Sequence, residues 1–151
     1  MEKFFRLLQT DDHVSGLICR LTLGIVMLPH GLQLLPGWFG GYGFEGSMAY
    51  FTQTKGMPWI LGFLVIMIQV FGSAALLLGF AGRLIAFGML VIFAGMVLST
   101  HAHHFFMNWH GDQQGEGFEY HILAMGLSLV VLLKGSGKYS ADRLLMRRRC
   151  G

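Results

Sequence analysis

Four long apolar stretches, separated by short polar segments, organise this sequence of 151 residues. Residues 14–35, 59–80 and 84–106 are each long enough to cross a hydrocarbon layer of about 30 Å, because an α-helix rises about 1.5 Å per residue. Residues 119–133 form a fourth, shorter stretch. The pattern predicts an all-α integral membrane protein, a four-helix bundle in one domain with a basic tail at residues 134–151.

Helix-breaking residues mark the ends of these stretches. Pro36 and Gly37 follow the first stretch, and no small-residue cleavage motif comes after it, so we expect an uncleaved span and not a signal peptide. Pro58 precedes the second stretch. Only the tripeptide AGR separates the second stretch from the third, and so short a connection predicts two antiparallel neighbours.

The composition agrees with a membrane protein. Hydrophobic residues make up 54% of the chain and charged residues only 13%, which is too little charge to cover the surface of a soluble domain of this size. The net charge of +3 comes from short basic patches beside apolar stretches. These patches do not alternate with aromatic residues, so we expect the lipid bilayer and no nucleic acid as partner.

The positions of lysine and arginine predict the orientation. Basic residues lie near the N-terminus, at Arg83 and in the tail, whereas the loops 36–57 and 107–118 contain only Lys55. Short cytoplasmic loops carry an excess of lysine and arginine. Both termini and the Arg83 turn are therefore expected in the cytoplasm, and the other two loops outside.

Polar side chains from three of the predicted helices fall in one layer near the outer surface, and Gln69 lies deeper in the second span. Ionisable and amide groups inside a membrane are costly unless they face the bundle interior or a wet cavity and find partners there. We therefore expect a shared pocket that opens outward. The side chains in this layer are His30, Gln33, His101, His104, Glu119 and His121.

The stretch from Ser99 to His121 holds five of the seven histidines and allows a metal site as one interpretation. Imidazoles and a carboxylate suit zinc, copper or iron, and the candidate ligands are His101, His104 and His121. The spacing HAHH matches neither HExxH nor CxxC, so the clue is one of composition.

Two further interpretations stay open beside the metal site. Histidines near the end of a span are comfortable in the headgroup zone without any ligand. Polar groups such as Gln69 also form hydrogen bonds between helices that only fix the packing, and Arg20 could reach a lipid phosphate by snorkelling.

Several motifs make the chain resemble the DoxX family of small four-span bacterial membrane proteins. They are RLTLGIVMLPHGLQLL, GGYGFEGSMAYF, QVFGSAALLLGFAGRL, STHAHHFF and GKYSAD, and together they cover the chain from about Leu17 to Asp142. The resemblance implies a multi-pass protein of the bacterial cytoplasmic (inner) membrane. It also implies similarity to membrane subunits of thiosulfate:quinone oxidoreductase and to membrane partners of thiol and superoxide defence complexes.

Two positions depart from the usual pattern of that family. Gln33 stands where a lysine usually follows the HG dipeptide, and Gln69 stands where the second span usually carries a glutamate. Both changes remove charge and count against a mechanism with a buried Glu and Lys pair. Glu119 and His121 remain as acid and base.

Two classes of function follow from these residues and the resemblance. One is a redox-linked oxidoreductase subunit that binds a quinone through His30, Gln33, Gln69 or His101 and exchanges protons through Glu119 or His121. The alternative is a non-enzymatic membrane anchor or assembly partner for other proteins or for further copies of the chain. A transporter is less supported, because no broken span or inverted repeat is present.

Overall fold

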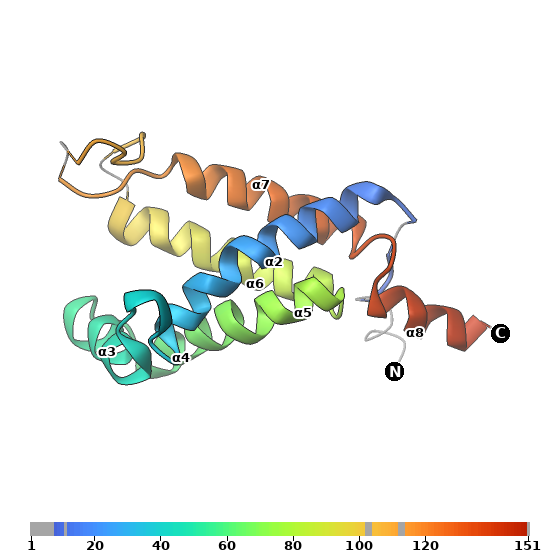
Figure 1. Cartoon of the computed structure of the whole chain (residues 1–151), viewed down its shortest axis with the longest axis horizontal. Coiled ribbons are helices and arrows are strands. Elements are labelled where there is room, and N and C mark those ends of the chain that lie inside the picture. Colours follow the sequence, from blue (N-terminus) through green and yellow to red (C-terminus); the bar gives the residue numbers. More distant parts are fainter. Residues whose placement is uncertain (1–7, 11, 102–103, 112–113, 151) are drawn as a thin grey trace.

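The computed structural model describes residues 8–10, 12–101, 104–111 and 114–150, and the regular elements among them are helices, with no strand (Figure 1). The all-α class is confirmed. The long helices are α2 (Val14–Leu34), the continuous run of α4 (Trp59–Met67), η3 (Ile68–Gly72) and α5 (Ser73–Leu78), the run of α6 (Gly82–Met96) and η4 (Val97–His101), and α7 (Glu119–Lys134).

Among the described residues, three helical runs are long and apolar enough to cross a membrane. They are Val14–Leu34, Trp59–Leu78 and Gly82–Ser99. Helix α7 has 16 residues, about 24 Å at 1.5 Å per residue, and packs along α6 and α2. The fourth helix thus completes the bundle but is shorter than the three spans.

The connection between the second and third spans is as short as expected but lies two residues earlier in the sequence. The second span ends at Leu78, and Gly79 adopts a left-handed conformation with φ of 68°. Ala81 is also left-handed, with φ of 51°, and α6 begins at Gly82. Asp142 stabilises this turn, because its carboxylate accepts hydrogen bonds from Ala81 N at 2.7 Å and from Gly82 N at 3.0 Å.

The segment after the first span is folded into short helices, whereas the sequence indicated only a loop. It forms η1 (Trp38–Gly40), α3 (Gly43–Ala49) and η2 (Tyr50–Thr54). This segment, called the cap below, packs on α4 and on one end of α2 (Figure 1). Met48 of the cap forms a buried apolar cluster with Ile66 and Val70 of the second span.

The larger apolar cluster lies between the long helices. Its buried members come from α2, α5, α6 and α7, so it joins all three spans and the shorter helix. These residues are Leu23, Met27, Leu76, Ala86, Met89, Phe93, Ala124 and Val131.

The two ends of the bundle are distinct in the structure. The cap and residues 104–111 and 114–118 lie at one end, called the outer end after its predicted orientation. The inner end carries the turn at Gly79 and helix α8 (Ala141–Cys150) (Figure 1). His13 and Thr10 lie there too, because Lys138 N donates to His13 O and Gly137 N donates to the hydroxyl of Thr10. The first and last described segments therefore lie at one end, as the predicted topology requires, while the side of the membrane stays a prediction.

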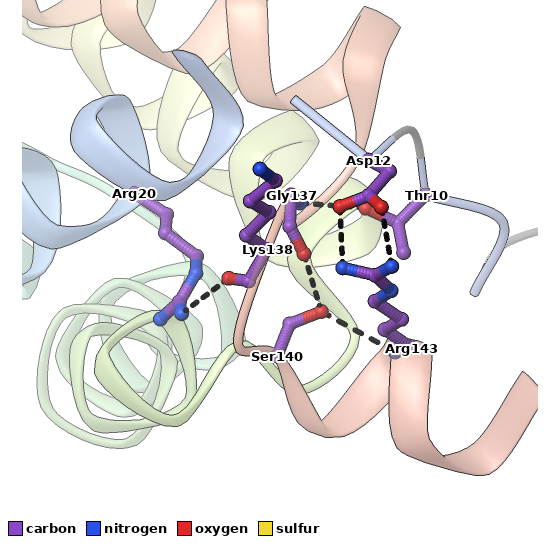
Figure 2. A network of polar contacts seen from close by, with 7 residues as sticks. All are labelled: Thr10, Asp12, Arg20, Gly137, Lys138, Ser140 and Arg143. Atoms are coloured by element: carbon purple, nitrogen blue, oxygen red, sulfur yellow. Dashed lines mark hydrogen bonds and ion pairs between the residues drawn. The ribbon is translucent and has the colours of Figure 1, made fainter. Parts of the chain in front are cut away.

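A buried arginine holds the inner end together. Arg20 is 2% exposed and donates hydrogen bonds to backbone carbonyls of α5 and of the segment after α7 (Figure 2 shows the bond to Lys138). The interpretation that Arg20 snorkels to a lipid phosphate is therefore wrong. The acceptors are Ser136 O at 2.8 Å, Leu76 O at 2.8 Å, Leu77 O at 2.7 Å, Tyr139 O at 2.9 Å and Lys138 O at 3.4 Å.

Candidate functional site

A cavity of about 640 Å³ lies at the outer end, between the long helices and the cap. Small-molecule sites typically occupy roughly 300–1,000 Å³, so the cavity has the size of a ligand pocket. Much of its wall is apolar or aromatic. Such wall residues include Met27, Leu34, Phe51, Phe93, Met96 and Met107.

The structure brings four of the predicted site residues to this cavity. His30 and Gln33 lie near the C-terminal end of α2, and Gln69 lies in η3. His121 is the third residue of α7. Gln69 and His121 are buried, whereas His30 is exposed at the mouth. The sequence thus predicted a common location for side chains that lie far apart along the chain.

Glu119 begins α7, where the sequence placed it, but its carboxylate has a different role from the one expected. It stands in the first turn of α7 and does not line the cavity. Its Oε1 accepts hydrogen bonds from Met107 N at 3.1 Å and from the indole Nε1 of Trp109 at 3.2 Å. The carboxylate therefore holds the loop that precedes α7. Glu116, which the sequence did not single out, lines the cavity instead.

The histidines that end the third span contribute little to the described site. His104 is half-buried and does not line the cavity, and its backbone oxygen accepts a hydrogen bond from Phe118 N at 3.2 Å. The side chain of His101 and all of His103 lie outside the described residues. Within the described part of the chain, no group of three histidine, cysteine, aspartate or glutamate residues is arranged to hold a metal ion.

Two buried polar groups on the cavity wall have no hydrogen-bond partner among the described residues. They are the amide Nε2 of Gln69, whose side chain is 1% exposed, and the hydroxyl of Ser47, which is 2% exposed. A buried polar group without a partner costs about 1–3 kcal/mol, and native proteins rarely keep one without a reason. A hydrogen-bonding ligand in the cavity would satisfy both groups.

Gln69 owes its place to a local irregularity and to a glycine on the neighbouring helix. It lies in η3, a π-helical turn inside the second span, and such turns are frequent at functional sites. Gly31 of α2 faces this turn so closely that an added Cβ would lie 2.6 Å from Gln69 O. The glycine therefore allows α2 to bring His30 and Gln33 next to Gln69.

Aromatic rings surround the buried imidazole of His121. The rings of Phe93 and Tyr120 contact it edge to face, with centroids 6.2 and 5.8 Å away. Tyr120 also lines the cavity, and its hydroxyl contacts the sulfur of Met27 at 3.6 Å. The imidazole of His121 is thus packed between two aromatic rings at the wall of the cavity.

The cap supplies the residues that the sequence did not reveal. Ser47, Tyr42 and Tyr50 line the cavity from α3 and its flanks. Their segment contains the motif GGYGFEGSMAYF, which carried part of the family resemblance. That motif was the available signal, but it does not indicate that the segment folds over a pocket.

Comparison with known proteins agrees with this architecture. The DoxX family model matches residues 15–102, more than half of the chain. The chain belongs to the DoxX family. Inner membrane protein YqjF of Escherichia coli (strain K12) is 29% identical over 137 residues, which are 91% of this chain and 96% of that protein. No solved structure matches the chain.

These matches confirm the family and the location that the sequence predicted. This DoxX-family protein is a multi-pass protein of the bacterial inner membrane, in contact with the lipid bilayer. The family match includes α2, the cap and the second span, which carry His30, Ser47 and Gln69. Helix α7 with His121 lies beyond the matched residues.

Proposed function

We propose that this protein binds a membrane quinone in the outer cavity and acts as the quinone-interacting subunit of a redox system. The observation that carries the proposal is the pair of buried groups without partners, Gln69 Nε2 and Ser47 Oγ, on the wall of one cavity. Both groups can donate a hydrogen bond. A quinone head group has two carbonyl oxygens that accept hydrogen bonds, so it matches the donors in chemistry.

The rest of the cavity suits the ring and the tail of such a ligand. Met27, Phe93 and Met96 offer an apolar wall for a flat ring. The long tail of a quinone is as apolar as lipid and stays in the bilayer beside the helices. Pockets of this kind combine a mostly apolar lining with a few placed polar groups.

Residues of this chain also offer routes for protons. A quinone supplies two-electron, two-proton redox chemistry when it is bound. His121 lines the buried wall and Glu116 the exposed mouth, and an imidazole or a carboxyl group can donate and accept protons. Glu119 acts as a positioning residue in this scheme, because it holds the loop that precedes α7. Electrons would come from another polypeptide.

The test is quinone binding by the purified protein in lipid nanodiscs. We would titrate a short-chain ubiquinone and follow the fluorescence of the three tryptophans. Gln69→Leu should weaken binding about tenfold, because it removes one hydrogen bond to the ligand and leaves the fold intact.

Ser73→Ala is the matched control. The hydroxyl of Ser73 is also buried and has no partner within the described chain, but it does not line the cavity. Removal of this hydroxyl should leave the dissociation constant of the quinone unchanged. If the unaltered protein showed no saturable binding, or if both variants lost affinity equally, the proposal would be wrong and the anchor or assembly function would be favoured.

A further inference from the structure

The inner end carries a second hollow that the proposed function does not use. It has a volume of about 630 Å³ and lies between the segment after α7, the first turns of α8 and Asp12. Figure 2 shows several of its residues around the start of α8. No residue is shared with the outer cavity, so an assignment here stands or falls independently of quinone binding.

Positive charge dominates this hollow. Lys138, Arg143 and Arg147 line it, and Asp12 is the acidic residue among its lining. Asp12 is already engaged, because its carboxylate forms a two-point ion pair with the guanidinium of Arg143 (Figure 2). Within the described residues, Lys138 and Arg147 have no carboxylate partner of their own. The hollow therefore has two cations available for an anion.

A strained residue forms the lip of the hollow. Tyr139 is left-handed, with φ of 52°, and its side chain is 85% exposed. A non-glycine residue in this conformation costs about 1–3 kcal/mol and persists only where its surroundings hold it. Arg20 does so by donating to Tyr139 O at 2.9 Å.

The segment after α7 also fixes the first turn of α8. Ser140 Oγ donates to Gly137 O at 2.8 Å and accepts a hydrogen bond from Arg143 N at 3.3 Å (Figure 2). The cations on α8 and Lys138 are thus attached to a rigid support, and the aromatic ring of Tyr139 is held outward next to them.

The hollow combines cations with an apolar lip. Leu144 lines it and is 55% exposed, and the ring of Tyr139 lies on the same lip. An amphipathic ring and a leucine beside lysine and arginine are typical of the boundary between headgroups and acyl chains. A freely dissolved phosphate would meet the charges but would gain nothing from the apolar lip.

We propose that this hollow binds the phosphate of an anionic phospholipid. Lys138 and Arg147 supply the charge, Arg143 is oriented by Asp12, and Tyr139 and Leu144 contact the glycerol and acyl region. By the predicted orientation the lipid belongs to the cytoplasmic leaflet, whose anionic lipids attract basic segments next to the membrane.

The test is lipid retention by the full-length protein in mild detergent, measured by native mass spectrometry. Phosphatidylglycerol should be retained, whereas phosphatidylcholine, with the same acyl chains, should not. Lys138→Gln or Arg147→Gln should each lower retention about fivefold, the effect of one cation near a membrane surface. The control is Lys134→Gln, which removes the same charge at the exposed end of α7, outside the hollow.

Three results would overturn the proposal. If Lys134→Gln lost as much phosphatidylglycerol as Lys138→Gln and Arg147→Gln, the lipid would be attracted by general surface charge and not by a site. Equal retention of phosphatidylcholine would exclude recognition of an anionic headgroup. Displacement of phosphatidylglycerol by millimolar inorganic phosphate would assign the hollow to a soluble anion.

The variant Tyr139→Gly distinguishes the contribution of the aromatic lip to lipid binding from its effect on the stability of the fold. Glycine adopts a positive φ without strain, so the variant should be at least as stable as the unaltered protein. It should nevertheless retain less phosphatidylglycerol, because the aromatic lip is lost. Full retention by this variant would contradict the role given to the lip.

Discussion

The two ends of this bundle treat buried polar groups in opposite ways. At the inner end, Arg20 donates to five backbone carbonyls, and the carboxylate of Asp142 accepts from two backbone amides and the hydroxyl of Ser136. At the outer end, Gln69 Nε2 and Ser47 Oγ are equally buried but have no partner in the described chain. The first arrangement stabilises the fold, and the second leaves two donors that the proposed ligand would engage.

Buried polar residues of this protein differ in how their desolvation is compensated. A buried charge is tolerable when it is neutralised by hydrogen bonds on every side, and such a network makes the structure rigid. A buried amide without a partner keeps its desolvation cost. Burial alone therefore does not distinguish a structural residue from a binding residue. The state of its hydrogen bonds and its place on a cavity wall are needed as well, because Ser73 is also buried without a partner in the described chain but does not line the cavity.

The largest expected effect is the loss of Arg20. Arg20→Met would leave several carbonyls unsatisfied and Asp142 without a nearby cation, and should lower the free energy of unfolding by about 3–5 kcal/mol. Thermal unfolding in detergent, followed by circular dichroism, measures this. Arg20→Lys keeps the charge with fewer donors, so its unfolding midpoint should lie between those of Arg20→Met and the unaltered protein. An unchanged midpoint in Arg20→Met would remove the contrast between the two ends.

A smaller effect is expected where α2 approaches the second span. Gly31→Ala places a Cβ 2.6 Å from Gln69 O, so the two helices must move apart, at a cost of about 1–3 kcal/mol. Gly126→Ala is the control, because an added Cβ there meets nothing within 4 Å. Alanine is the better helix former, so that variant should gain up to about 1 kcal/mol. Equal unfolding midpoints for the two variants would contradict the close approach of α2.

The smallest effect on stability is expected at the outer cavity. Gln69→Leu removes an amide that has no partner for its Nε2 in the described chain, so stability should stay equal or rise by about 1 kcal/mol while quinone binding weakens. The same unfolding experiment compares this variant with Arg20→Met. A loss of several kcal/mol would indicate that Gln69 is as much a structural residue as Arg20.

Much of the fold was predictable because the bilayer imposes it. Apolar length and helix-breaking residues placed the ends of the first two spans within two residues of Val14–Leu34 and Trp59–Leu78. The third span, expected at residues 84–106, is helical over Gly82–His101. The depth of His30, Gln69 and His121 followed from the rise of each helix, and the structure brings these side chains to one cavity. A membrane permits few arrangements of a long apolar stretch, so the local sequence pattern is sufficient to predict these helices.

Contacts between distant segments decided the rest. The apolar pattern does not show that residues 38–54 fold over a cavity and bring Ser47 to its wall, because their helices are short and are held by packing on α4. Nor does it show that Glu119 holds a loop or that Arg20 meets carbonyls more than fifty residues away. From the sequence it follows that Arg20 and Gln69 lie within apolar spans. Which buried polar groups have partners was settled only by the tertiary structure, since a hydrogen bond depends on where other segments place their atoms.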